Sequence, residues 1–237
     1  MITIKKYTLE DLRKRKRVCG KIVKWFEFDV YDLLPDGWEE YVKIWSMKHA
    51  VRKFVVPTSV TSREKDRSLK LPIAVISGDS ITLGLPWLFE YYETLFLDCA
   101  NLCYEDSIRT ARLNRYAVNL NLQRGDMRYE AHVDSNPVEG LLYATTHPKG
   151  TGGELIVSRN VNALGPEEID ESCEIIYPKA GRLLFFDYRD YPHYTKGLTC
   201  EDEVRIVVAM NYYTESCTEN ERPEDLDKHL YGVGLDW

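Results

Sequence analysis

The sequence predicts an α+β protein in which helices come first and an antiparallel β-sandwich or barrel follows. Two segments with helical periodicity lie in the N-terminal half, and from residue 115 onward short strand-like runs alternate with turns rich in glycine and proline. Many short strands at this spacing are typical of antiparallel sandwiches and barrels, and the preceding helices are expected to cover one sheet. With 237 residues, 44% of them hydrophobic, the chain can build one domain around a sizeable core.

The N-terminal region, residues 1–114, is expected to be a mostly helical support. Segments 36–54 and 85–107 have apolar residues at helical spacing. Between them, segment 55–72 is polar and contains prolines near both ends, which predicts a surface loop. The residues at helical spacing are Trp38, Tyr41, Val42, Trp45 and His49 in the first segment, and Leu88, Tyr91, Tyr92, Leu95 and Leu102 in the second.

Residues 115–213 form the predicted β-rich core. In segment 115–123, polar and apolar residues alternate with the period of a half-buried strand. Further strand candidates follow at 128–134, 140–147, 153–158, 173–179, 182–187 and 203–213. The tail, 214–237, is polar and acidic, which is compatible with a last helix or with a loosely held arm. We treat all three regions as one domain.

Composition excludes some classes of function. The net charge of −7 argues against nucleic-acid binding, although a basic run occupies residues 13–17. That run could be an address signal or a phosphate contact, but the acidic whole favours a solvated helix face or arm. Six scattered cysteines without a C-x-x-C pair, and no signal peptide, predict free thiols in a cytoplasmic protein. No apolar run is long enough for a membrane span, so we expect a soluble protein.

His132 and Asp134 are two residues apart in a segment with the character of a strand or strand end. Side chains at this spacing point to the same face of a strand, so both can reach one point. They could hold a metal, form a hydrogen-bonded pair, or simply satisfy a turn and cap a loop. A third metal ligand could come from His193, which follows strand 182–187 at a proline-containing turn, or from His147.

Arg205 follows His193 by twelve residues and lies in an otherwise apolar strand. A buried guanidinium is costly unless it meets an anion, and its rigid fork of donors fits a carboxylate. Strand alternation places Asn211 on the same face as Arg205. From the residues alone, both His193 and His147 remain possible third ligands.

The set His132, Asp134, His193 and Arg205 resembles the iron(II)- and 2-oxoglutarate-dependent dioxygenases, whose pattern is H-x-D, a distal histidine, and an arginine or lysine on the next strand. The resemblance covers residues 115–213 and implies a double-stranded β-helix, the cupin-like jelly-roll. It also implies that the three ligands bind Fe(II), and that Arg205 binds the distal carboxylate of 2-oxoglutarate. Dioxygen is the second co-substrate.

Within this family the chain is similar to the hydroxylases and halogenases of free amino acids. Asp134 stands where halogenases have a small residue, and Asn211 where nucleic-acid repair enzymes have a second arginine. Arg205 stands where collagen-type prolyl hydroxylases usually have lysine. The resemblance therefore implies hydroxylation of an unactivated C–H bond in a small molecule, above all a free amino acid or a derivative, with release of succinate and CO2.

Further contacts are expected around these residues. Candidates for contacts to the co-substrate are Tyr116 and Asn119, and candidates for contacts to the substrate are Tyr129, Glu130, Ser135, Asn136, Asn211 and Arg109. Of these, Glu130 would suit a cationic amine and Arg109 a carboxylate. Each charge, taken singly, could equally be a solvated surface group.

Two other classes of function remain compatible with the sequence. One is a hydroxylase of protein side chains, which would need a long open groove. The other is a non-catalytic jelly-roll that binds a ligand, because a fold does not determine a function. Within the small-molecule class, desaturation or cyclisation could replace hydroxylation, since the outcome depends on how the substrate is placed.

Overall fold

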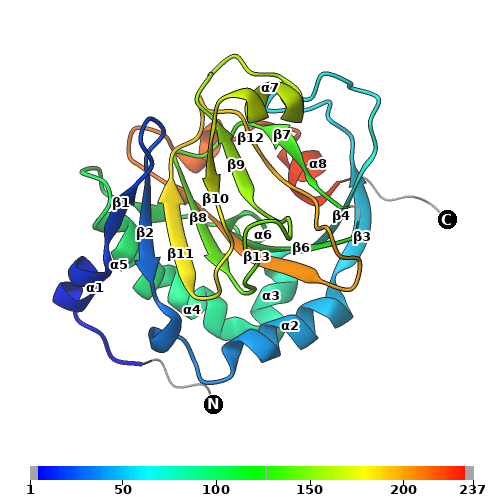
Figure 1. Ribbon diagram of the computed structural model, residues 1–237. Helices are drawn as coiled ribbons and strands as arrows, with labels where there is room; N and C mark the ends of the chain where they lie inside the picture. The colour runs from blue at the N-terminus through cyan, green and yellow to red at the C-terminus, as the bar shows by residue number, and fades with distance from the viewer. Residues whose placement is uncertain (1–4, 126, 233–237) are drawn as a thin grey trace.

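Two antiparallel β-sheets face each other in the computed structural model, which describes residues 5–125 and 127–232 (Figure 1). The larger sheet contains, in spatial order, β1 (Arg17–Cys19), β2 (Trp25–Asp29), β11 (Arg182–Phe186), β8 (Val138–Tyr143), β13 (Val204–Tyr213), β6 (Val118–Arg124), β4 (Leu71–Ile76) and β3 (Val51–Val55), with β5 (Arg109–Thr110) paired to β13. The smaller sheet contains β10 (Cys173–Ile176), β9 (Leu155–Ser158), β12 (His193–Thr195) and β7 (Tyr129–His132). The fold is thus mixed α/β with a large antiparallel sheet.

Most helices lie outside the sheets. Figure 1 shows α2 (Trp38–His49), α3 (Gly78–Gly84), α4 (Pro86–Glu93) and α5 (Leu95–Asn101) beneath the larger sheet. On the other side, α7 (Gly165–Glu171) packs on β9 and β12, and α8 (Leu226–Tyr231) packs on β3 and β4. The remaining short elements are α1 (Leu9–Arg15), α6 (Asn114–Ala117) and the 3-10 turns η1 (Tyr31–Leu33) and η2 (Glu219–Glu221).

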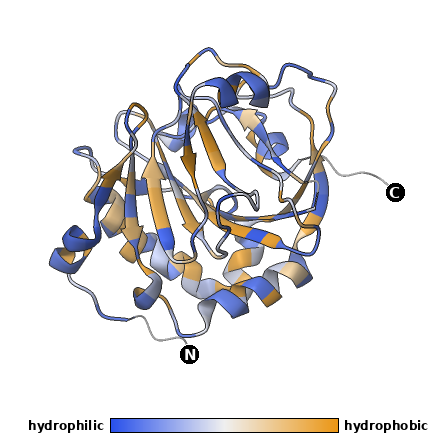
Figure 2. Cartoon of the chain, viewed as in Figure 1, coloured by the Kyte–Doolittle hydropathy of each residue, from blue (hydrophilic) through white to orange (hydrophobic). Residues whose placement is uncertain are grey.

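Strand alternation gives the larger sheet two different faces. One face joins the helices in a large apolar core, to which β6 and β13 contribute Val118, Leu120, Leu122, Ile206, Val208 and Met210. The opposite face of β13 packs Val207 and Ala209 against Leu155 and Val157 of β9, in a second core between the sheets. Figure 2 shows these facing strands as largely hydrophobic and the outer faces of α1 and α7 as hydrophilic. The expected alternation of β6 and β13 is confirmed.

The strand expected from residue 115 begins only at residue 118, because the chain first makes the helical turn α6. In this turn the N–H of Tyr116 donates to the carbonyl oxygen of Leu113. Gly78 of α3 lies so close that a Cβ there would be 1.8 Å from the carbonyl oxygen of Asn114. The packing of α3 thus overrides the local alternation and puts Tyr116 on a helix, which corrects its expected place in the strand.

Residues 1–114 contain more β-structure than the expected helical support. Strands β1 to β5 all come from this region and join the larger sheet. Helix α2 ends at Ala50, whose backbone is extended (φ −66°, ψ 132°), and β3 follows at once within the segment expected to be one helix. The second expected helix is divided into α4 and α5 at Thr94, which has φ −125° and ψ −93°.

Segment 56–70 is irregular, as predicted, but it is not merely a surface loop. It runs along the edge of β7, where the N–H of Arg63 donates to the Ala131 carbonyl (2.7 Å) and the N–H of Val133 donates to the Thr61 carbonyl (2.9 Å). These bonds satisfy backbone groups that an edge strand would otherwise leave unpaired. The loop is therefore part of the smaller sheet's border, and Ser62 and Glu64 are buried in it.

Part of the basic run 13–17 has partners within the protein. Arg15 donates to Asp32, with Nη2 at 2.8 Å from Oδ2, and the Lys16 ammonium lies 4.7 Å from the centre of the Phe26 ring. These contacts tie the end of α1 to η1 and to β2. They account for these two cations without a phosphate ligand.

Two further findings concern the whole described chain. All six cysteines are free thiols, and the most exposed of them is Cys200. No helix in the described ranges is long and apolar enough to cross a membrane.

The hydroxyl of Tyr92 joins α4 to the larger sheet, and its removal should lower stability. It accepts from the Ala111 N–H (2.7 Å) and donates to the Asn211 carbonyl (2.6 Å) in the buried core. We expect Tyr92→Phe to lower the free energy of unfolding by about 1–3 kcal/mol, because both backbone groups lose a buried partner. Urea denaturation measures this.

The control is Tyr41→Phe, which removes an exposed hydroxyl bonded to the Gly84 carbonyl (3.2 Å). It should change stability by less than about 0.5 kcal/mol. Equal effects of the two substitutions would contradict the role given to Tyr92.

Candidate metal centre

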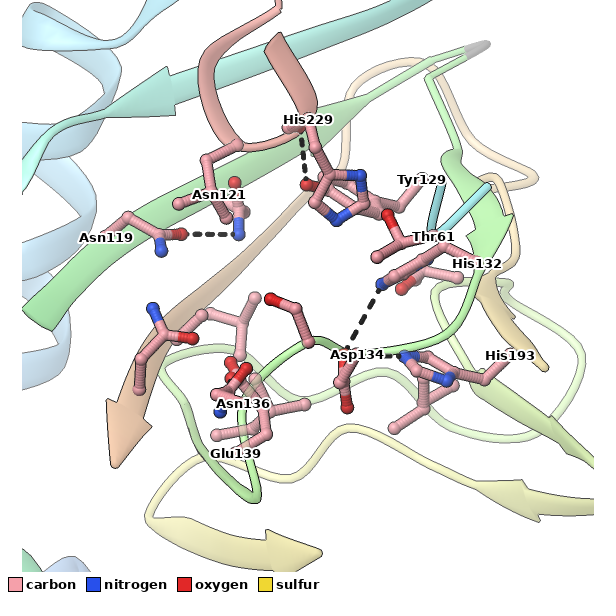
Figure 3. Close-up of a pocket in the computed structure, with 18 of the residues that line it drawn as sticks. Thr61, Asn119, Asn121, Tyr129, His132, Asp134, Asn136, Glu139, His193 and His229 are labelled. Carbon is pink, nitrogen blue, oxygen red and sulfur yellow. Dashed lines mark hydrogen bonds and ion pairs between the residues drawn. The ribbon is translucent and has the colours of Figure 1, made fainter. Parts of the chain in front are cut away.

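One pocket opens between the two sheets, and its walls come from both. The inward faces of β6, β8 and β13 line one side, whereas β7, β9 and β12 line the other. Residues from loop 56–70 and from α8 complete the lining (Figure 3). Strand alternation decides which side chains of each strand enter the pocket.

His132, Asp134 and His193 meet in this pocket. His132 ends β7 and His193 begins β12, and the two residues are direct partners in the antiparallel register. The centres of their rings are 4.3 Å apart. Asp134 Oδ1 lies 3.7 Å from Nε2 of His132 and 3.4 Å from Nε2 of His193. Among the described residues this is the one group of three side chains placed to hold a metal ion, with ligand atoms within 4.8 Å of one another.

Backbone hydrogen bonds fix the orientation of both imidazoles. Nδ1 of His132 donates to the Glu130 carbonyl (2.8 Å), and Nδ1 of His193 donates to the Tyr191 carbonyl (3.0 Å). Each ring therefore presents Nε2 to the pocket, which is the usual way in which a second hydrogen bond sets the metal-binding tautomer. The other oxygen of Asp134, Oδ2, is buried and has no hydrogen-bond partner among the described residues, so a cation fits this donor set.

The electrostatics of the triad differ between its two histidines. Burial, followed by the neighbouring His193 and His229, holds the pKa of His132 well below its usual value. Burial alone would lower the pKa of His193 as well, but the Asp134 carboxylate outweighs it and raises that pKa. A metal ion bound between Asp134 and His193 would replace the proton that the Asp134 carboxylate stabilises on the His193 ring.

His147, the competing third ligand, lies elsewhere. Its Nε2 donates to the Val204 carbonyl (3.1 Å), and its Nδ1 is 3.4 Å from Glu203. His147 therefore lies outside the group of possible ligand atoms, whereas His193 lies within it.

Arg205 enters the same pocket as the triad. It is 2% exposed, its Nη1 donates to Gln123 Oε1 (2.8 Å), and its guanidinium lies 5.3 Å from the centre of the Tyr143 ring. Among the described residues its hydrogen-bond partner is thus a neutral amide, and Nε has none. A guanidinium stays charged when buried, so this arrangement leaves its charge for the anionic group of a ligand.

The pocket has a second polar end. Arg205 and Asn211 are six residues apart on β13, which places them about 20 Å apart along the strand. Around Asn211 lie Glu139, its partner in register on β8, and Asn136, whose Nδ2 donates to Glu139 Oε2 (3.1 Å). Asn119 also lines the pocket, and its side-chain oxygen accepts from Asn121 (2.9 Å). Burial, and then the charge of Asp134, raise the pKa of Glu139 well above its usual value.

Some of the residues expected to contact the co-substrate or the substrate line the pocket, and others do not. Those that line the pocket are Asn119, Tyr129, Ser135, Asn136 and Asn211. Three others do not, and their expected roles are corrected here. Tyr116 lies on α6 beneath Arg222, and Arg109 is exposed and ion-paired with Glu215. Glu130 is completely buried behind the pocket wall, where it accepts from His229 Nδ1 (2.7 Å).

Sequence reasoning missed the contribution of the C-terminal tail. Helix α8 places Leu226, His229 and Leu230 in the pocket lining, and the His229 ring is 4.8 Å from the His132 ring. The sequence signal was the pair Leu226 and Leu230, two apolar residues four positions apart with His229 beside them, which is typical of an amphipathic helical turn. Glu139 was missed as well, because the predicted strand began at residue 140 and the sequence of β8 has no polar–apolar alternation that would mark its start.

Comparison with known proteins supports the fold. No family model and no curated protein matches the sequence. Among solved structures, the chain is similar to the non-heme alpha ketoglutarate dependent epimerase SnoN from nogalamycin biosynthesis, with 16% identity over 96% of this chain and 91% of that one (TM-score 0.59). It is also similar to an oxidoreductase of the 2OG-Fe(II) oxygenase family from Burkholderia pseudomallei, with 10% identity over 93% and 97% (TM-score 0.58).

A prolyl hydroxylase from Trichoplax adhaerens, solved with a hypoxia inducible factor peptide, is 15% identical over 88% of each chain (TM-score 0.50). The chain therefore has the fold of the 2OG-Fe(II) oxygenases. At these identities the similarity establishes the fold.

The triad should bind divalent metal, and loss of a ligand should weaken that binding. We expect Asp134→Asn and His193→Gln each to lower the affinity for Mn(II) at least about tenfold, because even outer groups of a metal site are worth about 10- to 100-fold. Isothermal titration calorimetry with Mn(II) measures this.

The matched control is His147→Gln, which alters a buried histidine that makes none of the triad contacts. It should leave the Mn(II) affinity unchanged within about twofold. An equal loss of affinity in this variant would contradict the assignment of the site.

Proposed function

We propose that this protein is an iron(II)- and 2-oxoglutarate-dependent oxygenase that hydroxylates an unactivated C–H bond of a small molecule, a free amino acid or a derivative of one. The observation that carries the proposal is the meeting, in one pocket, of the His132, Asp134 and His193 triad with the buried guanidinium of Arg205. In this proposal the two sheets form a double-stranded β-helix. Residues 115–213 are its catalytic core, 1–114 its support and 214–237 its tail, within one domain.

The triad would hold the metal through Nε2 of both histidines and one carboxylate oxygen of Asp134. Two imidazoles and one carboxylate are a donor set suited to iron(II), and they leave positions open for other ligands. Iron(II) bound there supplies, with 2-oxoglutarate and dioxygen, an oxidant strong enough for an unactivated C–H bond, and succinate and CO2 are the co-products.

Arg205 would bind the distal carboxylate of 2-oxoglutarate. Its fork of N–H donors matches a carboxylate in two-point contact, and the buried surroundings strengthen that contact. Gln123 holds one arm of the fork, and the ring of Tyr143 supports the guanidinium. The protein thus orients the donor group before the co-substrate arrives, so little is lost in ordering it.

The cover of the pocket supports a small substrate. Helix α8 lies over the pocket, where the backbone carbonyl of His229 accepts from the Tyr129 hydroxyl (3.1 Å). Apolar side chains, among them Leu141, Leu155 and Phe186, line the same pocket as the triad. Such a covered pocket favours a small molecule over a long polypeptide.

Anaerobic addition of Fe(II) and 2-oxoglutarate should produce the visible metal-to-ligand charge-transfer band of the chelated co-substrate. Arg205→Met should weaken the affinity for 2-oxoglutarate at least about 30-fold, because truncating one partner of a buried charge pair costs about 2–5 kcal/mol. Titration of the band with 2-oxoglutarate gives the dissociation constants of the wild type and of Arg205→Met.

The control is Arg124→Met, at the exposed end of β6, which should leave the affinity for 2-oxoglutarate within about twofold of wild type. A folded wild type that gives neither the band nor succinate would refute the oxygenase proposal, and it would favour a non-catalytic binding protein with the same fold.

A further inference from the structure

Glu139 brings a carboxylate into the pocket at the end remote from Arg205. It lies on β8, is 9% exposed, and lines the pocket with Asn136 and Asn211. In Figure 3 the side chains of Glu139 and Asn136 lie together at one border of the pocket, near Asp134. The proposed chemistry of iron and 2-oxoglutarate gives this carboxylate no task.

No fixed cation accompanies this carboxylate within the described residues. The side chain that hydrogen-bonds to it is the neutral Asn136, at 3.1 Å. Apart from histidines, the pocket lining contains one basic side chain, Arg205, which lies about 20 Å away along β13. A buried carboxylate without a cationic partner is costly, so the site is better suited to a ligand that supplies the cation.

The amides beside Glu139 are arranged to accept further hydrogen bonds. Asn136 uses Nδ2 for the Val138 carbonyl (2.7 Å) and for Glu139, and Asn211 uses Nδ2 for the Tyr116 carbonyl (2.7 Å). Their amide oxygens are therefore the groups left for a ligand. An ammonium group has three N–H donors and no acceptor, which matches one carboxylate and two amide oxygens.

We infer that Glu139, together with Asn136 and Asn211, binds the ammonium group of the substrate, so that the substrate is a small aliphatic amine such as an amino acid. This inference rests on the proposed oxygenase function and names the substrate class for the same pocket. It replaces Glu130, the carboxylate that the sequence indicated for this role, because Glu130 is already paired with His229.

Direct binding of matched probes tests the inference. The probes are the twenty protein amino acids, each paired with the carboxylic acid of the same skeleton that lacks the amino group. For lysine, 6-aminohexanoate and norleucine separate the two amino groups. Their effect on the charge-transfer band formed with Fe(II) and 2-oxoglutarate gives dissociation constants, and the band without a probe reports the integrity of the oxygenase site in each variant.

We expect at least one amino acid to perturb the band, and its partner without the amino group to bind at least about tenfold more weakly. Glu139→Gln should weaken binding of that amino acid about 10- to 100-fold, because a neutral amide loses the charge-assisted hydrogen bond. Glu139→Asp should restore part of the affinity. Glu203→Gln, a matched change near His147 and outside the triad pocket, should leave the affinity unchanged.

Three results would overturn the inference while leaving the oxygenase proposal intact. They are equal binding of the probes with and without the amino group, undiminished amino-acid binding by Glu139→Gln, and a wild type whose band responds to no amino acid. If the wild type gives no band, the oxygenase proposal fails instead. Calorimetric titration of the metal-free protein with the same probes then decides whether Glu139 binds an amine.

Discussion

The site depends on the pairing of β7 with β12. Because His132 and His193 are direct partners in that register, their rings lie 4.3 Å apart, with the Asp134 carboxylate in reach of both. A slip of one residue would turn an imidazole to the opposite face of the sheet and dismantle the triad. The backbone bonds between loop 56–70 and the outer edge of β7 therefore hold the triad side chains in place as well as the sheet.

Around this pairing the described residues bury ionisable groups whose charge is only partly compensated. Arg205 faces a neutral amide and Glu139 faces another, whereas Asp134 has His193 beside Oδ1 and no described hydrogen-bond partner at Oδ2. Each is unfavourable for the folded protein by itself, and the two large apolar cores on either side of the sheet offset that cost. The pattern is typical of a protein whose ligands bring the complementary charges, and it gives a physical reason to regard this pocket as a functional one.

The pocket joins parts of the chain that are far apart in sequence. Loop 56–70 supplies Thr61, the strands supply the triad and Arg205, and α8 supplies His229. Nδ1 of His229 in turn donates a hydrogen bond to Glu130. The Glu130 carboxylate, which strand alternation directs toward the pocket, is thus paired inside the protein, while Glu139 lines the pocket. The C-terminal tail, 214–237, therefore contributes to the lining of the pocket through α8.

The sequence by itself predicted the alternating strands β6 and β13, because strand periodicity is local. Its resemblance to a known family pointed to His132, Asp134, His193 and Arg205 as one site. Only the tertiary structure decided which other polar residues reach the pocket. Local alternation puts Glu130 on the same face as His132, yet the packing of α8 covers it. Packing of α3 turns Tyr116 into a helix, and the register of β8 with β13 brings Glu139 beside Asn211. These outcomes depend on contacts between distant segments, which no local pattern contains.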